Sequence, residues 1–240
     1  RFCSAIIGSW RSNSSVKMEN GLNNMSVSEV KMVAFGNPKR NDNAFIISSY
    51  SDSMGAQTRF ITCDDDEIFS NFNHGNIDWR NLTNGIHWLI NSAETILSGE
   101  SPKSAVGAGM TFGELEGAKM VMIVDVPENS EDISKSWGFV ISRIRQIHVL
   151  FFTPRALDAI SELEQIPVEN LLKDIRNRGL VPHVCTYLSD ERKAIVEHSI
   201  GSVSVITKNS LQPLEWLARY ICNLPFSGIG DLGVKNACLD

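Results

Sequence analysis

Four short apolar runs lie between Lys119 and Thr207 and determine the predicted fold: MVMIVDV (120–126), IHVLFF (147–152), VPHVCTY (181–187) and SVSVIT (202–207). The segments between them carry apolar residues three and four positions apart, which is the spacing of a helix with one buried face. Strands that alternate with helices are typical of an open, mostly parallel sheet with helices on both faces. We therefore predict an α/β fold of the Rossmann-like, three-layer αβα type with a mostly parallel central sheet.

The first half of the chain predicts further elements around this sheet. The run VKMVAF (30–35) is typical of a strand, and residues 44–50 and 59–63 flank a turn-rich segment, which predicts an antiparallel hairpin at the edge of the sheet. Residues 79–97 carry an apolar stripe with helical spacing, which predicts one long helix. Residues 98–117 are rich in glycine and predict an irregular surface loop.

The length of 240 residues is sufficient for one large α/β domain. We expect residues 1–224 to form this single domain, with a helix over residues 191–199 and another that begins near Pro213. Residues 225–240 contain several glycines, and we expect them to form an irregular C-terminal tail.

Charge and hydropathy limit the classes of partner. The formal net charge is −6, and the short basic spots at residues 39–40 and 143–145 are not the clusters of Lys and Arg that contact a phosphate backbone. No apolar run approaches the roughly 20 residues that span a bilayer. The sequence therefore predicts no nucleic-acid partner and no membrane span.

Candidate ligand contacts lie at the expected strand ends, because open parallel sheets bind ligands beyond the carboxyl ends of their strands. Asp125 closes the run 120–126, where a carboxylate suits metal coordination or general-base chemistry, or instead orders the next loop. Gly107 and Gly109 lie in the predicted loop and are candidate ligand contacts. They do not form a dinucleotide fingerprint, because no strand precedes them.

Motifs of the common enzyme classes are absent from the sequence. There is no G-x-S-x-G elbow, Walker loop, H-E-x-x-H or EF-hand pattern. His183 and Cys185 would share one face of the strand 181–187, as a nucleophile and its base, as two metal ligands, or as buried packing. These observations favour a protein without catalytic residues and without a cofactor.

Three stretches resemble the von Willebrand factor A (VWA) domain family: residues 64–97, residues 119–132 (KMVMIVDVPENSED) and residues 172–221. They are similar to the family's acidic short helix with its long helix, to the strand that ends in a TDG turn, and to the closing strands and helices. The resemblance implies a VWA-like fold with a metal-ion-dependent adhesion site. The matching positions are Gly8–Ser12, Thr83 and Asp125.

The sequence departs from the family pattern at this metal site. The leading Asp of the D-x-S-x-S motif is replaced by Gly8 and its first Ser by Trp10, so that only Ser12 remains. A divalent cation needs several oxygen ligands, so we expect a degenerate site that binds no metal. If a metal were bound, Ser12, Thr83 and Asp125 would be its ligands. The sequence also has one βα unit more than the family pattern around residues 147–178, which indicates an insertion or another Rossmann-like family.

Three functions follow from these patterns. The leading hypothesis is a non-enzymatic protein-binding module of adhesion or scaffold type, whose partner is another protein. The alternative is a Rossmann-like enzyme that binds a nucleotide or small ligand at the strand ends, with Asp125 as metal ligand or base. A third is a structural subunit of an oligomer or larger assembly. Polar groups that converge above the strand ends would favour a ligand site, and a flat, filled surface would favour a scaffold.

Overall fold

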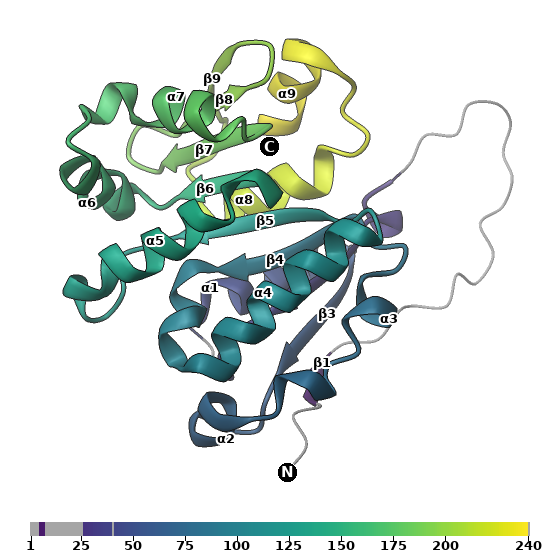
Figure 1. Ribbon diagram of the computed structural model, residues 1–240. Coiled ribbons are helices and arrows are strands. Elements are labelled where there is room, and N and C mark those ends of the chain that lie inside the picture. Colours follow the sequence, from purple (N-terminus) through teal and green to yellow (C-terminus); the bar gives the residue numbers. More distant parts are fainter. Residues whose placement is uncertain (1–4, 8–25, 40, 240) are drawn as a thin grey trace, which may run out of the picture.

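The computed structural model describes residues 5–7, 26–39 and 41–239, and in them nine strands form one sheet (Figure 1). The strand order is β1-β3-β2-β4-β5-β6-β7-β8-β9. The six neighbouring strands β3, β2, β4, β5, β6 and β7 run parallel to one another. Antiparallel pairs are formed by β1 with β3, β7 with β8, and β8 with β9. The bounds are β1 Ala5–Ile7, β2 Lys31–Phe35, β3 Gln57–Thr62, β4 Trp88–Ser92, β5 Lys119–Val124, β6 Ile147–Phe152, β7 His183–Leu188, β8 Lys193–His198 and β9 Ser202–Ile206.

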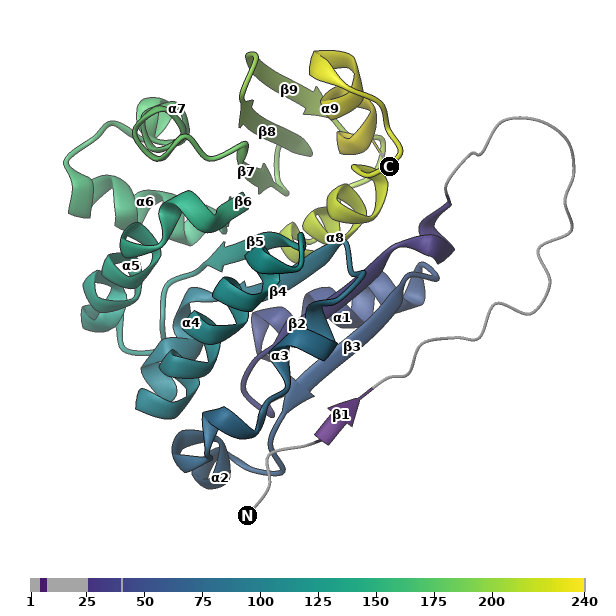
Figure 2. The same ribbon diagram turned by 45° about the vertical axis from the view of Figure 1, so that its right-hand side comes forward.

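Helices cover both faces of the sheet, as Figures 1 and 2 show from two directions. On one face lie α1 (Asn43–Ser53), α8 (Pro213–Asn223) and α9 (Gly230–Cys238). The opposite face carries the remaining helices: α2 (Asp66–Asn71), α3 (Trp79–Thr83), α4 (Glu100–Leu115), α5 (Ile133–Ser142), α6 (Pro154–Glu164) and α7 (Val168–Gly179). Within the described residues, no helix is both long and apolar enough to cross a membrane.

The central strands are continuous apolar runs because both of their faces are covered. In β5, Met120 and Met122 pack into the cluster under α4, and Val121 and Ile123 pack into the cluster under α1 and α8. The predicted three-layer fold with a mostly parallel sheet and an antiparallel edge is therefore confirmed. The antiparallel hairpin lies at β8 and β9, however, and not at residues 44–63, because residues 44–50 are part of α1.

The long helix predicted over residues 79–97 is wrong. Gly85 takes a positive φ of 70° two residues after α3 ends, and residues 88–92 then form the central strand β4. Every residue of β4 is buried, so its apolar run has no polar side from which the period of a strand could be recognised.

Three further predictions of secondary structure were wrong. Residues 98–117, expected as a loop, contain the 16-residue helix α4. Residues 191–199, expected as a helix, contain β8, in which alternate residues are buried. The C-terminal segment, expected to be irregular, contains α9, whose Val234, Ala237 and Cys238 are buried.

The strand order changes direction between β2 and β4. The chain leaves β2 for α1 on one face of the sheet, and it leaves β4 for α4 on the other face. Two neighbouring parallel strands whose connections depart to opposite faces leave a crevice at their carboxyl ends, which is where open α/β sheets bind ligands.

Candidate ligand-binding site at the strand ends

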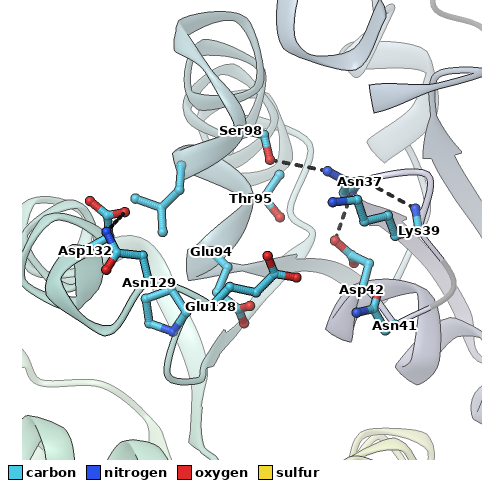
Figure 3. A pocket seen from close by; sticks show the side chains of 12 residues that line it. Asn37, Lys39, Asn41, Asp42, Glu94, Thr95, Ser98, Glu128, Asn129 and Asp132 are labelled. Carbon is cyan, nitrogen blue, oxygen red and sulfur yellow. Dashed lines mark hydrogen bonds between the residues drawn. The ribbon is translucent and has the colours of Figure 1, made fainter. Parts of the chain in front are cut away.

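A cavity of about 290 Å³ occupies this crevice (Figure 3). It is lined by residues that follow three adjacent parallel strands: Asn37, Lys39, Asn41 and Asp42 after β2, Glu94, Thr95, Leu97 and Ser98 after β4, and Pro127, Glu128, Asn129 and Asp132 after β5. Polar groups from separate parts of the chain thus converge above the strand ends.

Asp42 forms one wall of the cavity and also caps α1. Its carboxylate accepts hydrogen bonds from the backbone N–H groups of Ala44 (2.9 Å), Phe45 (3.2 Å) and Asn37 (2.9 Å). A side chain at Gly36 would collide with this carboxylate, so the glycine lets the loop after β2 pass close to it. Burial raises the pKa of Asp42 to about 6, and the three backbone donors oppose the rise.

Glu94 lies opposite Asp42, on the segment that follows β4 (Figure 3). Its Oε1 accepts hydrogen bonds from Asn43 Nδ2 (2.6 Å) and Ser92 Oγ (3.2 Å). Burial, and then the negative charge of Asp125, raise the pKa of Glu94 to about 7. The group is therefore near half ionised at neutral pH, so it can accept a proton as well as a hydrogen bond.

Two buried polar side chains near Glu94 lack partners. Thr95 lines the cavity and is only 2% exposed, and its buried hydroxyl has no hydrogen-bond partner among the described residues. The amide of Asn91, near the end of β4, is 1% exposed and likewise unpaired within the described chain. Buried polar groups are normally paired, so an orphaned hydroxyl at a cavity wall is available to a ligand.

The cavity is acidic. Asp42, Glu94, Glu128 and Asp132 line it, whereas Lys39 is the single cation among the described lining residues. Lys39 Nζ itself lies 3.3 Å from Asp66 Oδ2. Among the described residues no group of three or more His, Cys, Asp or Glu is arranged to hold a metal ion. The site therefore presents mainly hydrogen-bond acceptors.

Asp125 lies next to this cavity but does not line it. Its Oδ1 accepts a 2.6 Å hydrogen bond from Thr153 Oγ1, and Arg155 Nη2 lies 3.2 Å from both carboxylate oxygens. Thr153 is in turn the N-cap of α6. Asp125 thus ties the end of β5 to the start of α6, and it influences the site through its charge on Glu94.

The other candidate residues lie away from the cavity. Thr83 is fully buried in α3 and donates to the carbonyl of Trp79 at 2.7 Å. Gly107 and Gly109 are buried in α4, where they face Arg143 and Trp79 instead of a ligand. Ser12, with the rest of Gly8–Ser12, lies outside the described residues. The described candidates therefore do not come together as one site.

Sequence reasoning missed Asn37, Asp42, Glu94 and Thr95. A signal was present for Asp42. An Asp that follows a strand and a Gly-Asn-Pro turn is typical of a helix N-cap, which would have placed Asp42 at the carboxyl end of the strand 30–35. No comparable signal marked Glu94, because its segment was assigned to a helix and its strand end was not recognised.

Comparisons with known proteins identify the fold. No protein-family model matches the sequence, and no curated protein is found to be similar. A 2-dehydro-3-deoxygluconokinase from Thermotoga maritima is similar in structure, with a TM-score of 0.60 and 9% identity over 86% of this chain and 89% of that chain. A fructokinase double mutant from Vibrio cholerae, bound to fructose, ADP and potassium, has a TM-score of 0.60 and 12% identity over 88% and 77%. An adenosine kinase from Sinorhizobium meliloti has a TM-score of 0.59 and 11% identity over 87% and 71%. The fold is therefore ribokinase-like.

These neighbours overturn the VWA assignment, because they are sugar and nucleoside kinases. One of the three stretches that carried the resemblance, residues 64–97, required a long helix over residues 79–97, and that segment contains β4 instead. The leading hypothesis of a non-enzymatic adhesion module with a degenerate metal site was wrong for the same reason. The alternative, a nucleotide or small ligand bound at the strand ends, agrees better with the fold and with the hollow, polar rim.

Proposed function

We propose that the protein binds a neutral, polyhydroxylated small molecule, a sugar or a nucleoside, in the cavity above β2, β4 and β5. The observation that carries the proposal is the facing pair of carboxylates, Asp42 and Glu94, at the point where the strand order reverses. Ionised carboxylates only accept hydrogen bonds, and ligand hydroxyls can donate to them. The Asn37 amide and the unpaired Thr95 hydroxyl add groups that can both donate and accept.

Size and charge restrict the ligand further. The volume of about 290 Å³ is at the lower end of the roughly 300–1,000 Å³ typical of small-molecule sites, so it favours a ligand of one or two rings. Four carboxylates against one lysine disfavour a phosphate group inside the cavity. The part of the ligand that enters is therefore uncharged.

The similar structures make phosphoryl transfer to a ligand hydroxyl the reaction to test first, since their names are those of kinases acting in sugar and nucleoside chemistry. Glu94 is the group suited to accept the hydroxyl proton, because its pKa of about 7 lies close to neutral pH. This step extends the binding proposal and depends on it.

Titration calorimetry with fructose and adenosine, which are both uncharged, tests the binding step. We expect at least one of these probes to bind, and Glu94→Ala to weaken it about tenfold or more, since a hydrogen bond to a charged group contributes roughly 1.5–3 kcal/mol. Glu131→Ala is the matched control, because Glu131 is exposed on the same side of the molecule but does not line the cavity. Binding that is equally strong in Glu94→Ala would contradict the proposed site. ADP formation from ATP in the presence of the bound probe then tests transfer.

A further inference from the structure

A second cavity, of about 250 Å³, lies at the opposite edge of the sheet, where the parallel strands begin. Trp88, Lys119, His148 and His183 line it from the starts of β4, β5, β6 and β7. The glycine-rich segment Gly228–Gly230, which leads into α9, closes its other side. Figure 2 shows α9 in yellow beside β9. This cavity shares no lining residue with the one above the strand ends.

Positive and N–H-bearing groups face this cavity. Lys119 is exposed, has no ion-pair partner within the described residues, and has its Nζ 5.9 Å from the centroid of the Trp88 ring. His148 Nδ1 accepts a 3.3 Å hydrogen bond from the backbone N–H of Met120, so the neutral ring carries its proton on Nε2. His183 Nδ1 lies 2.8 Å from the Tyr220 hydroxyl, and this hydrogen bond orients the ring.

The backbone before α9 adds further donors. Its N-cap residue, Ile229, has no side-chain acceptor, so the first N–H groups of α9 have no partner within the helix. Gly228 and Gly230 have positive φ angles of 99° and 69°, which bring this turn to the cavity wall. The carboxylate of Asp231, in the same turn, lies 2.9 Å from His198 Nε2 and does not line the cavity.

Two carboxylates act on these groups from outside the lining: Asp231 lies in the first turn of α9, and the charge of Glu114 acts on His148. The described lining residues include no Asp or Glu. Burial, with the charges of His198, Lys119 and His148, lowers the pKa of His183 to about 4. Both histidine rings are therefore neutral at pH 7, and Lys119 carries the one full charge in the described lining.

We infer that this second cavity is a site for a phosphate group carried by a small phosphorylated molecule, with Lys119 as its counter-charge and the two histidine rings and the α9 N-terminus as donors. Helix N-termini with glycine turns and basic side chains suit phosphate oxygens. A phosphate alone would not fill about 250 Å³, so the apolar surface of Trp88 and Val234 is left for the organic part of the ligand. This inference does not depend on the proposed function.

An NMR titration of ¹⁵N-labelled protein with inorganic phosphate tests the site. We expect saturable shifts of the amide signals of Gly228, Gly230 and Asp231, and weaker shifts with acetate at equal concentration. Lys119→Met keeps the apolar stem over Trp88 and should weaken phosphate binding about tenfold, the value of one charge-assisted hydrogen bond. Ile229→Asp should weaken it at least as much, because Ile229 is 95% exposed and lines the cavity.

Leu232→Asp is the matched control, since it places a carboxylate on the same exposed helix end but outside the cavity lining. It should retain most of the phosphate affinity, and Glu94→Ala should leave phosphate binding unchanged, which separates this site from the proposed sugar site. The inference is overturned if phosphate shifts none of these amides, or if Lys119→Met and Ile229→Asp bind phosphate as tightly as the unaltered protein. Tighter binding of acetate than of phosphate would overturn the assignment of the ligand class.

Discussion

Asn43 Nδ2 donates a 2.6 Å hydrogen bond to Oε1 of Glu94, and this contact joins the first turn of α1 to the segment after β4. The two residues stand on opposite sides of the crevice at which the strand order reverses. Asn43 is 8% exposed, so the bond is protected from water and fixes the Glu94 carboxylate at the cavity wall. The site is therefore preorganised by the same contact that holds two connections of the sheet together.

Glu94→Gln should reduce the pH dependence of stability. The pKa of Glu94 is raised in the folded protein from 4.5 to about 7, so the folded state holds more protons than the unfolded state between these values. The free energy of unfolding must therefore fall as the pH rises from about 4.5 through about 7. We expect a fall of roughly 1–2 kcal/mol from this group, after allowing for its partial exposure. Asp42, whose pKa is raised to about 6, acts in the same direction.

Urea unfolding at a series of pH values measures this effect. The unaltered protein should lose stability across the interval, and Glu94→Gln should show a flatter profile and a higher stability at pH 8. Parallel profiles for the two proteins would show that the Glu94 carboxylate does not have a raised pKa.

Thr153→Val should destabilise the protein by about 1–2 kcal/mol. Thr153 Oγ1 donates to Asp125 at 2.6 Å and accepts from the backbone N–H of Ala156 at 3.3 Å, so the substitution removes a helix cap and a hydrogen bond to a charged group. Arg155→Ala, the control, removes the ion pair to the same carboxylate. The Arg155 side chain is 72% exposed, so this loss should stay below about 0.5 kcal/mol. Thermal unfolding of both variants compares them, and equal losses would assign the stabilisation to the ion pair.

Gly109→Ala should destabilise α4 although alanine favours helices. A Cβ at Gly109 would lie 3.0–3.1 Å from three atoms of the Trp79 indole, a buried ring that cannot move freely. Overpacking of this kind costs roughly 1–3 kcal/mol. Gly138→Ala in α5 is the matched control, since no atom lies within 4 Å of its Cβ position, and it should stabilise the protein by about 0.5–1 kcal/mol. Denaturant unfolding of the two variants should therefore shift in opposite directions.

The sequence predicted secondary structure best where a proline or a glycine marks the boundary of a segment. The run 147–152 was predicted with the bounds of β6, because Pro154 marks where the strand ends. The run around Trp88–Ser92 failed because a strand buried on both faces has no polar side, so its apolar residues also fit a helical stripe. For the segment Gly107–Gly113, glycines suggested a loop, whereas in α4 they allow close packing against Trp79 and Met120.

The candidate site was less predictable than the fold, for a physical reason. Its residues follow β2, β4 and β5, and they become neighbours only through the reversal of strand order, which requires β4 to be recognised. The general expectation that ligands bind at the carboxyl ends of the strands located the rim, and Asp125 was placed beside the cavity. The particular side chains Asp42, Glu94 and Thr95 depended on long-range pairing that spacing in one sequence does not encode.

Thr95→Val should weaken ligand binding without lowering the stability of the protein. The Thr95 hydroxyl is buried without a partner among the described residues, so its folded state carries a desolvation cost that is not compensated. Valine has nearly the same shape and no hydroxyl, and we expect the variant to be as stable as the unaltered protein or more stable by about 1 kcal/mol. If this hydroxyl serves the ligand, the same variant should bind the sugar or nucleoside probe about tenfold more weakly.

Thr83→Val is the control for this prediction. The Thr83 hydroxyl is buried but bonded to Trp79, and it lies outside the cavity, so this variant should lose stability and keep its affinity. A Thr95→Val protein that is clearly less stable than the unaltered protein would show that the hydroxyl is satisfied in the free state, and would remove one of the groups from which the proposed site is built.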